Sequence, residues 1–97
     1  MTIISDTDRG PTTTGVVTIR IPCGAASDLV TDAEERLSRA ENIDAVAVDE
    51  LHGIDPKLSA TVVTVGVTLR GTAAMTDAQV RRRLAAVPGL ESIELIR

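Results

Sequence analysis

The chain has 97 residues, of which 43% are hydrophobic and 25% charged, and its formal net charge is −4. This length builds one domain around one core. The negative charge and the absence of Phe, Tyr and Trp argue against phosphate-backbone binding and base stacking. The single cysteine has no partner for an internal disulfide, and no apolar run matches a membrane span or a signal peptide. We therefore expect a cytoplasmic protein without membrane insertion, nucleic-acid partner or cofactor.

Residues 1–14 are polar and rich in turn-forming residues, with no sustained period. This pattern predicts a flexible N-terminal arm, followed by a single domain over residues 15–97. The domain is expected to begin with a strand from Gly15, because apolar residues occupy every second position from residue 17 to residue 21. Pro22 and Gly24 are expected to end this strand.

The first helix is predicted from a stripe of apolar residues at helical spacing. Its members are Leu29, Ala33, Leu37 and Ala40. Ser27 is the expected N-cap of a helix of about 13 residues, although Thr31 followed by Glu34 also matches a capping box and allows a later start. Asn42 is expected to end the helix.

Two strands are expected next, joined as a hairpin. The first runs over residues 43–51, the turn over residues 52–57, and the second over residues 59–70. The last of these is the clearest strand in the chain, because Val63, Val65, Val67 and Leu69 fall at every second position.

A second helix is predicted over residues 77–86. Thr76 and Gln79 match a capping box, and Met75 before them can pack on Val80. Pro88 and Gly89 stop the helix. A final strand then covers residues 90–96.

The order strand, helix, strand, strand, helix, strand predicts a ferredoxin-like fold, an α+β sandwich in which a four-stranded antiparallel sheet carries both helices on one face. The first and third strands are expected to be central and parallel to each other. Their ends would then bring together five residues suited to a small anionic ligand. These residues are Cys23, Gly24, Arg70, Gly71 and Thr72. The hairpin with His52 would lie at the opposite end, which excludes a Cys/His nucleophilic pair.

Two further groups of charged residues have alternative interpretations. Asp49, His52 and Asp55 could surround a divalent metal ion, or could belong to a solvated hairpin, and Asp49 and Glu50 are expected to point to opposite faces of their strand. The basic run of residues 81–83 predicts a solvated helix face or a contact with an acidic partner surface, such as the first helix of another copy.

The sheet face without helices is expected to be unusually rich in Val and Thr. Its predicted members are Val16, Thr18, Arg20, Val46, Val48, Val62, Thr64, Gly66, Thr68 and Ile96. A surface with so few charges favours burial against a second copy or another domain. We therefore expect a homo-oligomer, with a dimer as the simplest form.

The order of elements, together with the sequence LAAVPGLESIEL of residues 84–95, resembles the last helix and strand of ACT-like regulatory domains. This resemblance implies association through sheets or helices and binding of amino acids or other small effectors at interfaces. The chain is also similar in topology to heavy-metal-associated domains, but Cys23-Gly24-Ala25-Ala26 lacks their second cysteine.

The interpretation that follows is a non-enzymatic regulatory or assembly module that self-associates through its open sheet face and binds a small ligand at an interface. One alternative is a small ferredoxin-like enzyme with a site between subunits, which would have few catalytic groups, since the chain has one His, one Cys and no Tyr. The other is a divalent-metal-binding protein that uses Asp49, His52 and Asp55.

Overall fold

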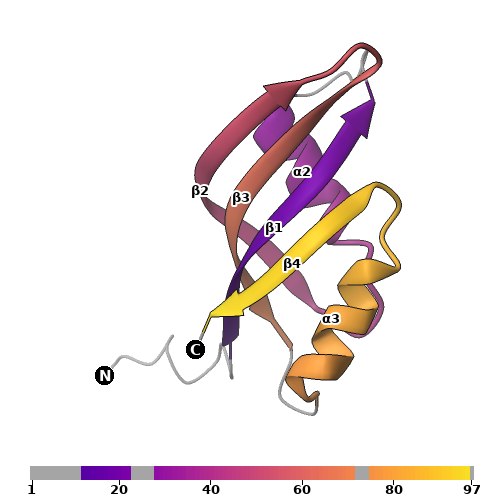
Figure 1. Ribbon diagram of the computed structural model, residues 1–97. Helices are drawn as coiled ribbons and strands as arrows, with labels where there is room; N and C mark the ends of the chain where they lie inside the picture. The colour runs from indigo at the N-terminus through magenta and orange to yellow at the C-terminus, as the bar shows by residue number, and fades with distance from the viewer. Residues whose placement is uncertain (1–11, 23–27, 72–74, 97) are drawn as a thin grey trace.

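The computed structural model describes residues 12–22, 28–71 and 75–96. The elements along the chain are β1 (Thr12–Pro22), α2 (Leu29–Leu37), β2 (Ala45–Pro56), β3 (Ala60–Arg70), α3 (Asp77–Ala85) and β4 (Leu90–Ile96) (Figure 1). This order is the one that the sequence predicted. The boundary of the N-terminal arm was wrong, because residues 12–14 already pair with β3 as part of β1; residues 1–11 lie outside the described part.

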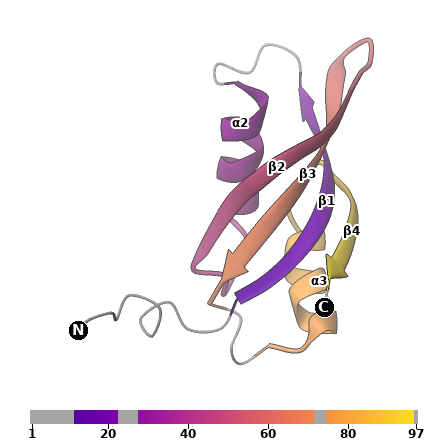
Figure 2. The ribbon, with the colours of Figure 1, turned by 90° about the vertical axis from the view of Figure 1, so that its left-hand side faces the viewer.

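The four strands form one sheet in the order β2-β3-β1-β4, and every neighbouring pair is antiparallel. The prediction that β1 and β3 are central is confirmed, but the prediction that they are parallel is wrong. Helix α2 carries the chain back to the end of the sheet where β1 begins, so β2 runs parallel to β1. The hairpin then turns the chain around, so β3 runs antiparallel to both. Two adjacent central strands of opposite direction are the result (Figures 1 and 2).

The core lies between one face of the sheet and the two helices. It takes alternate residues of β1 and β3, which are almost fully buried, together with the apolar stripes of α2 and α3. The largest of these side chains are Ile19, Ile21, Leu37, Leu69 and Leu84. We call the side that packs on the helices the helix face, and the other side the open face.

Helix α2 starts one residue later than predicted and is shorter. Asp28 is its N-cap, and the carboxylate accepts from the backbone N–H of Thr31 at 2.9 Å and from the Thr31 hydroxyl at 3.1 Å. The expected N-cap, Ser27, lies outside the described residues. The helix ends at Leu37, where the Ser38 hydroxyl donates to the Glu34 carbonyl at 2.7 Å, before tighter turns lead to Asn42.

The cap makes the stability of the protein dependent on pH. The hydrogen bond from the Thr31 N–H, followed by the one from its hydroxyl, lowers the pKa of Asp28 below its usual 3.8. The folded state therefore favours the ionised carboxylate, so the stabilisation is complete above pH 3.8 and is lost as the pH falls through the lower, folded-state pKa. We expect Asp28→Ala to lower the thermal midpoint at pH 7, and the difference from the parent to shrink as the pH falls below 3.8. Circular dichroism melts at several pH values would measure this difference in thermal midpoint. The exposed acid Glu35, replaced by alanine, is the control, and an undiminished Asp28→Ala difference at low pH would contradict the cap.

Strand β2 differs most from expectation. The predicted turn over residues 52–57 is largely strand, and the hairpin turns after Pro56, where the Lys57 N–H donates to the Ala60 carbonyl at 2.7 Å. The pairing with β3 shifts register between Val48 and Glu50 and again between Leu51 and Gly53. These bulges break the alternation that identifies a strand, and an edge strand tolerates both Gly53 and Pro56, so turn-forming residues do not end it.

The C-terminal half folds as the sequence predicted. The capping box of α3 is confirmed: the Gln79 N–H donates to the Thr76 hydroxyl at 3.2 Å, and the Thr76 N–H donates to the Gln79 side chain at 2.9 Å. Met75 packs against the core, and β4 covers the predicted residues. No helix in the described ranges is long and apolar enough to cross a membrane.

Candidate functional site

The predicted anion site at the ends of β1 and β3 does not exist as one site. Pro22 pairs with Ala60, whereas Arg70 pairs with Thr12. The end of β1 and the end of β3 are therefore separated by the length of the sheet, about 33 Å at 3.3 Å per residue. Arg70 and Gly71 lie at one end, and Pro22, which precedes Cys23, lies at the other. The error came from the assumed parallel strands, and Cys23, Gly24 and Thr72 themselves lie outside the described residues.

The same error removes the argument that separated His52 from Cys23. The tip of the β2–β3 hairpin lies at the end of the sheet where β1 finishes, since Pro56 and Pro22 both pair with the first residues of β3. His52 sits within β2, between the residues paired with Val65 and Thr64. Its side chain reaches over Gly66, because a Cβ atom at that glycine would lie 3.0 Å from His52 Nε2.

The register places most of the predicted face residues on the open face of the sheet. In antiparallel pairs, residues directly opposite each other share a face, and Val16, Thr18 and Arg20 lie opposite Gly66, Thr64 and Val62. Further residues of this face are Thr14, Thr68, Ser92, Glu94 and Ile96. The Thr18 and Thr64 hydroxyls are 3.1 Å apart and hydrogen-bonded across the two central strands.

Val46 and Val48 are exceptions, because both point to the helix face. Val46 lies opposite Leu69 and is 7% exposed, and Val48 lies opposite Val67. Ala45 and Ala47 take their places on the open face. The sequence could not decide this, because residues 45–48 are small or apolar at every position, so both phases of the alternation fit a buried side.

The bulges of β2 bring acidic residues to the open face. Asp49 accepts a hydrogen bond from the Thr68 hydroxyl, and Glu50 Cγ would lie 3.3 Å from a Cβ atom at Gly66. Thr68 and Gly66 both belong to the open face. The expectation that Asp49 and Glu50 point to opposite faces was therefore wrong, because the extra residue of a bulge interrupts the period of two.

The proposed metal ligands are engaged separately. Asp49 bonds Thr68, Asp55 lies 3.0 Å from the Lys57 ammonium, and His52 Nε2 lies 3.5 Å from a Glu50 carboxylate oxygen. Within the described ranges, no three His, Cys, Asp or Glu side chains are close enough together to hold a metal ion.

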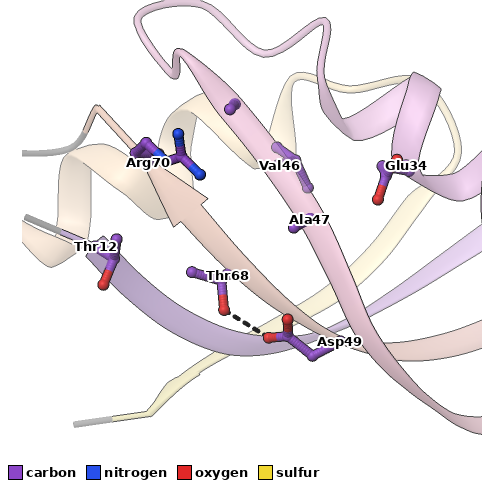
Figure 3. Close-up of a pocket in the computed structure, with 8 residues that line it drawn as sticks. Thr12, Glu34, Val46, Ala47, Asp49, Thr68 and Arg70 are labelled. Carbon is purple, nitrogen blue, oxygen red and sulfur yellow. Dashed lines mark hydrogen bonds between the residues drawn. The ribbon is translucent and has the colours of Figure 1, made fainter. Parts of the chain in front are cut away.

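A hollow of about 570 Å³ lies at the end of the sheet where β3 finishes (Figure 3). It is lined by Thr12, Glu34, Ala45, Val46, Ala47, Asp49, Thr68 and Arg70. Figure 3 shows that Thr12, Thr68, Asp49 and Arg70 surround its open-face side, and that Glu34 stands across β2 from them. The Arg70 guanidinium forms no ion pair with any described residue.

Of the two predicted ligand residues that the structure describes, Arg70 lines this hollow and Gly71 does not. The sequence missed Thr12, Glu34 and the two alanines, because these residues come from three different elements and meet only when the sheet is assembled. The arrangement offers one guanidinium, two threonine hydroxyls and two carboxylates around a floor of small residues. It can bind polar groups of a ligand, and its described lining holds no Cys, Lys or His side chain.

A comparison of the chain with protein-family models, with curated protein sequences and with solved structures finds no match. The fold and the site described above are therefore the observations on which a function can be argued. They define a small α+β protein with an open four-stranded sheet.

Proposed function

We propose that this chain is a ferredoxin-like, non-enzymatic regulatory or assembly module that works in the cytoplasm as a homo-oligomer, joined through the open sheet face. The observation that carries the proposal is the central stripe of this face. Its side chains come from the two central strands and are small, apolar or hydroxyl-bearing. The stripe consists of Val16, Thr18, Val62, Thr64, Gly66 and Thr68.

The surroundings of this central stripe support a protein partner. Interfaces have a poorly charged centre and a polar rim, and here the charged groups come from the edge strands and the ends of the central strands, with Glu50 and His52 reaching over the stripe at Gly66. Arg20, 3.8 Å from Glu91, and Arg70 carry positive charge at opposite ends of the central strands, whereas Asp49 and Glu50 carry negative charge on β2. A second copy offers both signs, so it can match this rim without a separate acidic or basic partner.

The hollow beside Arg70 adds a place for a small ligand. It opens on the margin of the central stripe, so a second copy on the open face would cover one side of it. Binding at such a junction would couple ligand occupancy to association, which is the behaviour that the ACT-like resemblance of residues 84–95 implies.

The solution mass of the purified protein tests this proposal. Light scattering and sedimentation over a concentration range from about 1 μM to 1 mM should show a dimer or larger assembly that dissociates on dilution. A monomer at every concentration would contradict self-association.

A further inference from the structure

The sheet has two edge strands, β2 and β4, and they differ in how well they are protected against pairing with another strand. An unprotected edge offers a row of free N–H and C=O groups, and natural proteins block such edges with bulges, proline or covering groups. The contrast between the two edges of this sheet indicates where a further strand can add.

The β2 edge is interrupted from Val48 to Pro56. A carboxylate oxygen of Glu34, on α2, accepts from the Val48 N–H at 2.9 Å, so a helix side chain occupies a backbone donor of this strand. Two bulges follow, between Val48 and Glu50 and between Leu51 and Gly53, and the strand ends with Pro56. A new strand could not form a continuous ladder here.

The β4 edge is less protected, although it carries two exposed acids, Glu91 and Glu94. The strand contains no proline and no lysine, and its one irregularity lies near its start, opposite Thr18 and Ile19. Within the described part of the chain, the backbone of residues 91–95 forms hydrogen bonds with β1 and with no other element. The outward-pointing backbone groups of residues 91–95 therefore have no hydrogen-bond partner among the described residues.

We infer that β4 pairs antiparallel with β4 of a second copy, joining two sheets edge to edge into one. A two-fold axis at Ile93 places residues 90–96 opposite residues 96–90 of the partner copy. Ile93 then faces itself on the helix side, and Ser92 faces Glu94 on the open side, so that no acid stands directly opposite an acid. Moving the axis to Glu94 would set two carboxylates against each other, which disfavours that register.

This contact is independent of the open-face contact proposed above. The axis stands perpendicular to the sheet, so both open faces remain uncovered and point the same way. Edge pairing alone gives a dimer, and edge pairing combined with two-fold face contacts gives a tetramer with two kinds of interface.

A disulfide at position 93 tests the edge contact, in a Cys23→Ser background that removes the natural thiol. Residues opposite each other in an antiparallel pair have Cα atoms about 4.5–5.5 Å apart, within the range that a disulfide spans. We expect Ile93→Cys to give a cross-linked dimer under mild oxidation. Leu58→Cys, at the exposed tip of the β2–β3 hairpin, is the matched control, because it lies away from β4 and outside the open face.

Substituting the exposed Ser92 by an acidic or a basic residue provides a second test that leaves the core intact. In Ser92→Asp, each copy would place a new carboxylate opposite Glu94 of the other copy. In Ser92→Lys, each copy would place an ammonium group there and form an opposite-charge pair. We expect the dimer dissociation constant to rise about tenfold in the first variant and to fall about tenfold in the second. High salt should reduce both changes.

The outcomes separate this inference from the proposed function. Cross-linking at position 93 above the Leu58→Cys background, with opposite effects of the two Ser92 variants, supports edge pairing. Assembly in solution without cross-linking at position 93 overturns edge pairing and leaves face association standing. A monomer that shows no cross-link at position 93 overturns both. If Ile93→Cys fails to fold, equal association of the two Ser92 variants overturns edge pairing.

Discussion

Replacing Val62 and Thr64 together by lysine is expected to abolish association through the open face without unfolding the protein. Both residues lie at the centre of the Val/Thr stripe, on the strand next to β1. In a two-fold face-to-face contact the double variant would place four ammonium groups in a region that excludes water. Burial of like charges costs several kcal/mol, so the dissociation constant of this contact should rise at least about 100-fold.

The fold should survive this double variant, because neither side chain enters the helix-face core. The Thr64 hydroxyl gives up its hydrogen bond with Thr18, which costs about 1 kcal/mol of the free energy of unfolding. Lysine stems can lie along the sheet with their ammonium groups in water. Circular dichroism should therefore show the parent secondary structure with a modest drop in thermal midpoint.

The matched control is Leu58→Lys at the tip of the β2–β3 hairpin. Leu58 is fully exposed and lies outside the open face, so this variant adds charge without entering the proposed contact. Sedimentation of the three proteins at equal concentration would compare them. If edge pairing through β4 also operates, the double variant should stop at the edge-paired dimer. Unchanged association of the double variant would show that the open face is not a contact between copies.

Replacing Gly89 by alanine is expected to destabilise the protein by about 2–4 kcal/mol, for two reasons that add. Gly89 has a φ of 88°, a left-handed conformation that costs an L-residue about 1–2 kcal/mol. A Cβ atom there would also lie 2.6 Å from the Arg20 carbonyl oxygen. Relief of that clash would move the backbone that carries the hydrogen bond from the Arg20 N–H to the Gly89 carbonyl, now 2.8 Å long, worth about 1 kcal/mol.

Gly53→Ala is the control for this substitution. No atom lies within 4 Å of a Cβ at Gly53, and its φ is not in the left-handed range. Its substitution should change stability by less than about 1 kcal/mol, in the stabilising direction if the unfolded chain loses freedom. Urea unfolding followed by circular dichroism would measure both variants. Equal stability of Gly89→Ala and Gly53→Ala would contradict the close approach between the turn before β4 and the end of β1.

The amino-acid sequence by itself determined the features that depend on neighbouring residues. The alternating valines of β3 fix which of its sides is buried, because strand side chains alternate and only one side is apolar. The capping box at Thr76 fixes the start of α3, and Pro88 with Gly89 fixes its end, since these signals act within a few residues. The order of the six elements followed from such local signals.

The tertiary structure alone decided the features that depend on how distant segments meet. Pairing with β3 determined which side of β2 is buried and placed Val46 in the core. It also introduced the bulges that bring Asp49 and Glu50 to the open face. The direction of β3 relative to β1 separated Arg70 from the end of β1 and placed it beside Thr12 and Thr68 instead. Register and strand direction are set by the assembled sheet, and a sequence that is apolar or small on both sides of a strand carries no local signal for them.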